Sequence, residues 1–297
     1  MNRLRNSFLI LITALAGATF AQPGDLQVVT KRIEKTFPYR PGFDLNIEGE
    51  KAEVIIQSSG AMEIQVTMEL IARHPERRIA ERDLQHMKFQ VEQIDERIFL
   101  RNYLSPAEGS PAPESAYDAR YLITVPPDCP VYLKNEYGEA SIADLTNSLR
   151  VNSSFTRLGL QDLGGNIDLR TRFGDLEARR IDGQVRINAR RSDVTLEDIS
   201  GDFDIAAQYG LLRIMADQRL LRLRLDAEQS EVFLTSTTPE QFAYELEAHH
   251  SEVRLPANMA FTWTSNTDAL KQASFTPQQE FYPSFRITIR FSELTVR

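Results

Sequence analysis

The stretch Val131-Tyr-Leu-Lys-Asn-Glu-Tyr-Gly-Glu-Ala-Ser-Ile142 begins a pattern that returns every 18 residues until about Asp217. The first and third positions of each copy are large and apolar: Val131, Leu149, Ile167, Val185 and Phe203, then Leu133, Val151, Leu169, Ile187 and Ile205. The seventh position is aromatic in four of five copies: Tyr137, Phe155, Phe173, Arg191 and Tyr209. Self-similarity at a fixed period is the signature of a repeat architecture.

Each copy is predicted to contain two short strands. Apolar and polar residues alternate on both sides of the turn, as in Leu158/Leu160, and a second turn rich in Asp, Asn and Gly follows. One such unit cannot bury a core, but stacked units can, because equivalent inward side chains pack while backbone ladders join strands about 4.8 Å apart. The sequence therefore predicts an all-β chain, a β-solenoid (β-helix-like) of two-strand coils of about 18 residues.

Weaker copies extend the pattern in both directions. Residues 223–234 and 244–255 fit it with slips of two or three residues, a last copy lies at 285–296, and an early copy lies at 43–54. Between residues 75 and 86 the apolar spacing changes to that of a helix, with a proline at an early position. We therefore expect one short helix in the N-terminal part.

These patterns predict the organisation of the whole chain. The expected segments are a signal peptide at 1–21, an extended lead-in at 22–42, an N-terminal β region at 43–128 with the short helix at 75–86 and a loop at 104–118, β-solenoid repeats at 129–260, and a C-terminal cap and last coil at 261–297. Residues 268–284 do not fit the repeat, and either a covering cap or a lateral loop is compatible with them. Residues 43–125 are compatible with first coils or with a separate β layer.

The N-terminus has the pattern of a cleaved secretory signal. Arg3 and Arg5 precede an apolar run that is too short to span a bilayer, and Thr19-Phe20-Ala21 resembles a cleavage site. The expected location is outside the cytoplasm, in the periplasm or at the cell surface. No stretch after Ala21 is apolar enough for a transmembrane helix.

The amino-acid composition limits the kinds of partner that the protein is expected to bind. Removing residues 1–21 takes the formal net charge from −8 to −10, which argues against a nucleic-acid partner because phosphate binding needs a dominant basic face. Cys129 is the only cysteine, so no internal disulfide forms, and we expect a structural thiol. The predicted partners are a glycan or an envelope protein.

The sequence contains no recognised catalytic or cofactor motif, and we predict no catalytic residues, metal ligands or cofactor. His250 occupies the seventh, mostly aromatic position, which favours ring stacking over metal ligation. Asp144, Asp162 and Asp198 recur at the second turn. Calcium binding and hydrogen bonds to turn amides are both compatible with such a column, and the turn role is favoured because Arg180 interrupts it.

Arginines on the outward-facing positions give the one candidate ligand surface. It consists of Arg170, Arg172, Arg186 and Arg190, and acidic residues such as Asp168 lie among them. A mixed surface of this kind usually reflects cross-strand pairing, and a binding patch for acidic glycans is the alternative interpretation.

The repeated pattern from Val131-Tyr-Leu-Lys-Asn-Glu-Tyr-Gly to Ser251-Glu-Val-Arg-Leu255 resembles the putative-adhesin family of exported bacterial proteins, whose adhesin heads are built from such coils. The resemblance covers roughly residues 43–255. It implies a β-helix-like fold and a cell-envelope location, and it carries over no catalytic residue. Fold alone does not fix function.

The leading hypothesis is an exported, non-enzymatic β-solenoid that acts as an adhesin-like binding or structural module at the cell envelope. One alternative is a polysaccharide-active β-helix enzyme, which would need carboxylates or basic groups converging on a groove. A second alternative is a periplasmic accessory or sensor protein for a membrane regulator.

Overall fold

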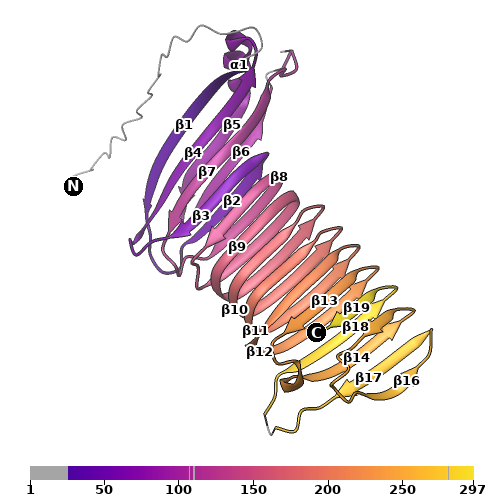
Figure 1. Cartoon of the computed structure of the whole chain (residues 1–297). Helices are drawn as coiled ribbons and strands as arrows, with labels where there is room; N and C mark the ends of the chain where they lie inside the picture. The colour runs from indigo at the N-terminus through magenta and orange to yellow at the C-terminus, as the bar shows by residue number, and fades with distance from the viewer. Residues whose placement is uncertain (1–25, 107, 110, 280) are drawn as a thin grey trace.

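The computed structural model describes residues 26–106, 108–109, 111–279 and 281–297; the predicted signal peptide at 1–21 lies outside the described residues. The chain is mostly β, and Figure 1 shows an elongated body with the α-helix at one end. The prediction of a β-rich chain with one short helix in the N-terminal part is confirmed: the helix, α1, spans Arg77–Leu84.

The strands alternate buried and exposed residues, as the sequence pattern predicts. They are β1 (Gln27–Pro38), β2 (Asp44–Glu50), β3 (Ala52–Ser58), β4 (Glu63–His74), β5 (Met87–Ile94), β6 (Arg97–Leu104), β7 (Ala116–Val125), β8 (Val131–Ala143), β9 (Ser148–Arg172), β10 (Leu176–Arg190), β11 (Val194–Gln208), β12 (Leu211–Glu228), β13 (Glu231–Ser236), β14 (Ala243–His249), β15 (Glu252–Arg254), β16 (Thr262–Asn266), β17 (Leu270–Phe275), β18 (Ser284–Arg290) and β19 (Glu293–Val296). A 3₁₀ turn, η1 (Pro239–Gln241), lies between β13 and β14.

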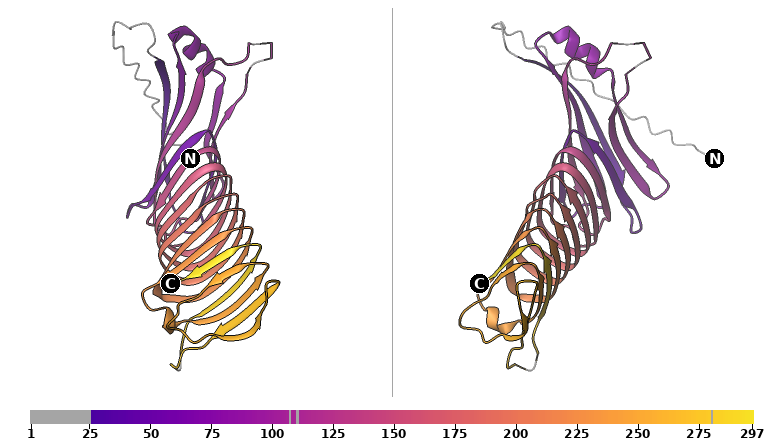
Figure 2. Two further views of the ribbon diagram at one scale, coloured as in Figure 1. Left: turned by 45° about the vertical axis from the view of Figure 1, so that its right-hand side comes forward. Right: turned by 90° about the vertical axis from the view of Figure 1, so that its right-hand side faces the viewer.

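Parallel pairing of β8, β9, β10 and β11 forms the middle of the molecule, where the long strands bend and wind around the body (Figure 2). The register is the 18-residue offset of the sequence repeat: Val131 lies opposite Leu149, Ile167 opposite Val185, and Val185 opposite Phe203. Equivalent residues of successive copies are therefore nearest neighbours across the sheet.

The core runs along the inside of this stack. The apolar residues at the first and third positions of the five strong copies are at most 4% exposed. Small residues at the first turn bring neighbouring backbones close together. At Gly174, for example, an added Cβ would lie 2.1 Å from the carbonyl oxygen of Thr156.

The N-terminal region joins the stack directly and also extends beyond it. β2 lies between β6 and the first half of β8, and β3 lies between β7 and the second half of β8, all in parallel pairs. Outside them the pairing becomes antiparallel, with β5 on β6 and with β4 between β7 and β1. Residues 43–125 thus contribute one parallel layer and a set of antiparallel strands. Within the lead-in predicted at 22–42, β1 is a paired strand.

Helix α1 packs against β1 and β4 at the N-terminal end of the body. Its buried Asp83 accepts hydrogen bonds of 2.8 Å from the backbone amides of Glu114 and Ser115, which tie the end of the 104–118 segment to the helix. Cys129 is buried as a free thiol, as expected for a structural cysteine. Within the described residues, the structure has no helix long and apolar enough to cross a membrane.

The C-terminal copy ends the chain but not the stack. β18 pairs in parallel with β12 on one side and with β14 on the other, and β19 lies in the same way between β13 and β15. The far end of the stack is formed instead by β17 and β16, which pair antiparallel with β14 and with each other (Figure 1). The sequence is compatible with either a cap or a lateral loop at 268–284. This segment includes β17, a strand that covers the end of the stack.

Candidate binding surface

A column of exposed rings follows one edge of the stack, at the seventh position of each copy. Tyr137, Phe155, Phe173, Arg191 and Tyr209 all have a left-handed backbone, with φ between 51° and 60°. This conformation turns the chain sharply between the two strands of a copy. The four aromatic side chains remain 40–55% exposed. We call these five residues the aromatic edge.

The parallel register stacks the members of the aromatic edge face to face. The Tyr137 and Phe155 ring centroids are 4.9 Å apart with planes 6° from parallel, and the Phe155 and Phe173 centroids are 4.8 Å apart at 5°. The guanidinium of Arg191 continues the stack, 5.4 Å from the Phe173 ring and 5.7 Å from the Tyr209 ring. Arg191 therefore replaces a ring with a planar cation instead of interrupting the column.

An open groove extends the aromatic edge toward the C-terminal end of the stack. It is lined by residues that include Tyr209, Gln229, Phe291, His250 and Lys271. His250 and Phe291 stack with centroids 5.4 Å apart and planes 5° from parallel, which confirms the predicted stacking role of this histidine. No group of three or more His, Cys, Asp or Glu side chains able to hold a metal ion occurs in the described part of the chain.

The four arginines predicted as a ligand surface lie together on the outer face of two neighbouring strands. Arg170 and Arg172 belong to β9, and Arg186 and Arg190 belong to β10. Arg172 lies directly opposite Arg190 in the register, and all four are exposed. We call this set the basic face.

Acidic neighbours compensate the basic face only in part. Asp168 lies 3.8 Å from the guanidinium of Arg170 and 3.6 Å from that of Arg150. Among the described residues, Arg172, Arg186 and Arg190 form no ion pair; Arg172 donates one hydrogen bond of 3.4 Å to the Ser154 hydroxyl. Arg186 lies between Asp168 and Asp204 in the register, so the uncompensated positive charge of the basic face is at Arg172 and Arg190.

The aspartates at the second turn share one backbone conformation, and one of them, Asp162, pairs with an arginine. Asp144, Asp162 and Asp198 themselves adopt the left-handed conformation, with φ between 53° and 62°. The Asp162 carboxylate accepts two hydrogen bonds from Arg180, at 2.5 and 2.7 Å, and one from Gln161. These bonds lower the pKa of Asp162 to about 2. The prediction that Asp162 bonds to turn amides is wrong, because its neighbour in the column is an arginine that takes both oxygens.

Sequence reasoning found the basic face but did not treat the aromatic edge as a surface. Aromatic residues at a repeated position ordinarily indicate a core. Here the rings are exposed because their backbone is left-handed, and the residue types at this position do not predict that conformation. The useful signal is the small residue that follows each member, such as Gly138 or Gly174, because it marks the sharp bend at which the ring must leave the core.

Solved structures of three bacterial proteins are among those similar to this chain. No family model matches the chain, and no curated protein matches it. A putative adhesin from Bacteroides fragilis is 12% identical with a TM-score of 0.47, and the match covers 90% of this chain and 97% of that one. A putative adhesin from Parabacteroides merdae is 9% identical with a TM-score of 0.35, covering 91% and 96%. A putative cell adhesion protein from Clostridium sporogenes is 10% identical with a TM-score of 0.28, covering 90% and 99%. These are proteins of the kind that the sequence resembles.

Proposed function

We propose that the chain is an exported β-solenoid that acts as a non-enzymatic, adhesin-like binding module at the cell envelope, and that its ligand is an acidic polysaccharide. The solenoid is supported by the 18-residue parallel register from β8 to β11. Export is supported by the signal-like sequence of residues 1–21.

The ligand class is inferred from one observation: the basic face and the aromatic edge are next to each other. Arg172 immediately precedes Phe173, and Arg190 immediately precedes Arg191, so guanidinium groups and exposed rings adjoin along the same strands. Guanidinium groups bind carboxylates and sulfates through paired hydrogen bonds. The ring edges that the stack leaves exposed offer apolar contact to the C–H groups of sugars. An acidic sugar presents both partners.

The repeat suits a polymer better than a single sugar. Each strand adds one member to the aromatic edge at a spacing close to that of the backbone ladder, as the 4.8 and 4.9 Å ring separations show. Many weak, equally spaced contacts along one line give avidity for a repeating ligand without a deep pocket.

The proposal includes no catalytic step. Glycoside hydrolysis ordinarily uses two carboxyl groups on either side of the scissile bond. The basic face presents four guanidinium groups, and its closest carboxylate, Asp168, lies beside Arg150 and Arg170. This arrangement favours holding an anion over cleaving a glycosidic bond.

The test measures retention of residues 22–297 on columns of acidic and of neutral polysaccharides, with released sugars assayed in the flow-through. We expect retention on the acidic column alone, and we expect the double variant Arg172→Glu/Arg190→Glu to abolish it. The matched control, Arg78→Glu/Arg213→Glu, makes the same change in net charge away from the basic face and should stay bound.

Each other result points to a different function. Equal loss of retention in both double variants would mean that only net charge matters, and it would refute the assignment to the basic face. Released sugar would show a polysaccharide-active enzyme. Passage of the unaltered protein through every polysaccharide column would overturn the proposal in favour of a protein partner, such as a membrane regulator.

A further inference from the structure

The order of strands differs from their order in the chain at both ends of the stack: β2 and β3 lie between β6/β7 and β8, and a second change of order lies near the C-terminal end. After β13 the chain passes through η1 to β14 and skips one position of the stack. That position lies between β12/β13 and β14/β15. It is filled by residues 284–297, which follow β16 and β17 in the chain. We call this position the strand slot.

Residues 284–297 fit the strand slot as a full member of the repeat. Five of their six large apolar side chains are at most 3% exposed: Phe285, Ile287, Ile289, Leu294 and Val296. The sixth, Phe291, lies at the turn and is exposed. Backbone hydrogen bonds join the segment to both walls, as in Phe291 to His249 at 2.9 Å and Glu293 to Ser230 at 3.0 Å. An empty slot would leave two strand edges unpaired and the adjacent core open to water.

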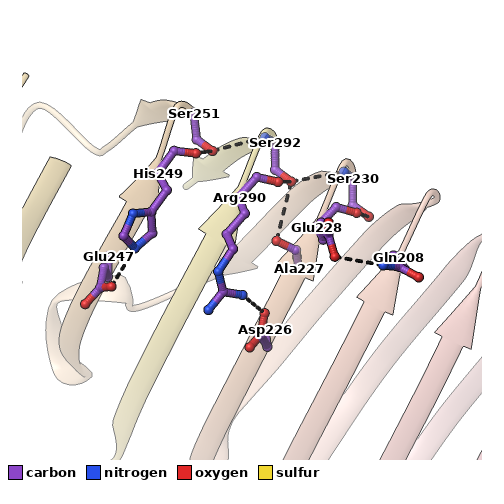
Figure 3. Close-up of polar contacts among 10 residues, drawn as sticks. All are labelled: Gln208, Asp226, Ala227, Glu228, Ser230, Glu247, His249, Ser251, Arg290 and Ser292. Atoms are coloured by element: carbon purple, nitrogen blue, oxygen red, sulfur yellow. Dashed lines mark hydrogen bonds and ion pairs between the residues drawn. The ribbon is translucent and has the colours of Figure 1, made fainter. Parts of the chain in front are cut away.

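Side chains add specificity to the backbone ladder. A chain of serine hydroxyls crosses the slot in Figure 3: the Ser230 amide donates to the Ser292 hydroxyl, and the Ser292 amide donates to the Ser251 hydroxyl, both at 3.0 Å. On the outer face Arg290 pairs with Asp226 at 2.6 Å, on the β12 side (Figure 3). Arg286 pairs with Glu245 of β14 at 2.7 Å. Only one register satisfies these contacts together.

A short connection leads from the end of the stack to the strand slot. Residues 276–283 connect β17, on one side of β14, to β18 on the other side. Every contact described above lies between this segment and the walls, so an identical segment from another molecule can make the same set.

We propose that the strand slot is a specific acceptor for residues 284–297 in trans as well as in cis, so that two copies of the chain exchange their C-terminal coils. The expected product is a symmetric dimer in which each molecule fills the slot of the other. The partner is a second copy, because the register, the serine chain and the two ion pairs match this segment. This inference stands apart from the polysaccharide proposal, because the slot lies within the stack and makes no use of the basic face.

The test uses disulfide cross-links across the slot in full chains. Glu245 and Arg286 are direct neighbours on β14 and β18, and parallel neighbours about 4.8 Å apart lie within disulfide range. Chains carrying Glu245→Cys and chains carrying Arg286→Cys are unfolded together in urea with reductant, refolded at high concentration and then oxidised. A covalent dimer of the two variants is the expected product. Burial raises the pKa of the native Cys129 thiol to about 12, so the introduced cysteines carry the reaction.

Two controls decide the interpretation. The double variant Glu245→Cys/Arg286→Cys, refolded in dilute solution, should cross-link within one chain and so shows that the segment still reaches its slot. A mixture of Glu245→Cys with Arg290→Cys is out of register, because Arg290 lies opposite His249, about 13 Å along the strand. Cross-linking within the double variant but not in the matched mixture would overturn the proposal. Equal dimer yields from the matched and out-of-register mixtures would mean random collision and would overturn it as well.

Discussion

Replacing Phe155 with glycine is expected to destabilise the chain less than replacing it with alanine, which reverses the usual order for a residue in a sheet. Phe155 combines a left-handed backbone, with φ of 52°, and a ring stacked on both Tyr137 and Phe173. Either substitution removes both stacks. Only glycine also relieves the backbone strain, since it has no Cβ.

The magnitudes can be compared directly. Loss of two stacked pairs costs about 1–3 kcal/mol in either variant, at about 0.5–1.5 kcal/mol per pair. Alanine retains the left-handed penalty of about 1–2 kcal/mol that phenylalanine also carries. Glycine removes this penalty but gives the unfolded chain about 0.5–1 kcal/mol of additional freedom. The glycine variant should therefore be the more stable of the two by about 0.5–1 kcal/mol.

Equilibrium urea unfolding of both variants measures this difference, and Tyr132 supplies the matched control. Tyr132 lies within β8, outside the positions of positive φ. There the glycine variant should be the less stable one by about 0.5–1 kcal/mol. If glycine is also the worse substitution at position 155, the left-handed edge stores no strain and the reasoning fails.

Two further predictions concern packing and pH. Gly174→Val should destabilise the chain by more than about 3 kcal/mol in urea unfolding, because its Cβ would overlap the Thr156 carbonyl. Gly60 has open space around it, so Gly60→Ala should change the stability by less than about 0.5 kcal/mol. Similar costs at both sites would contradict this prediction. Asp83 has a pKa of about 2 in the folded chain: burial alone would raise it, but hydrogen bonds from Ser115 and the other donors outweigh that effect. A lowered folded-state pKa gives stability that is complete above about pH 4 and is lost as the pH falls toward 2. The difference in unfolding free energy between the unaltered chain and Asp83→Asn should therefore shrink over that interval, and a constant difference would refute the assignment.

The sequence predicted the parts of the fold that depend on side-chain period. The 18-residue spacing places Val131, Leu149 and Ile167 in one inward column, and the ladder of β8, β9 and β10 has that register. This works because an inward position repeated at a fixed interval leaves only one offset at which all copies bury the same face.

The sequence could not predict which copies are neighbours once the pattern slips. Residues 285–296 carry the same inward positions as the copies at 223–234 and 244–255, so the pattern fits any order of the three. The order observed, with the last copy between the other two, depends on where the 237–242 and 276–283 connections lead. Such connections carry polar and turn residues without a period, and their path is set by tertiary packing.

The same register that builds the core also decides where charge accumulates. At some positions of the outer surface it places opposite charges on neighbouring strands, as in the pairs of Arg222 with Asp202 and Arg286 with Glu245, both at 2.7 Å. At Arg172 it places another arginine, Arg190, in the neighbouring position. Two like charges one strand spacing apart repel by about 1 kcal/mol at most in water, which the fold can tolerate but gains nothing from. Like charges also lie opposite each other elsewhere, as with Glu53 and Glu139. At the basic face, a bound polyanion would turn the repulsion between Arg172 and Arg190 into two attractions.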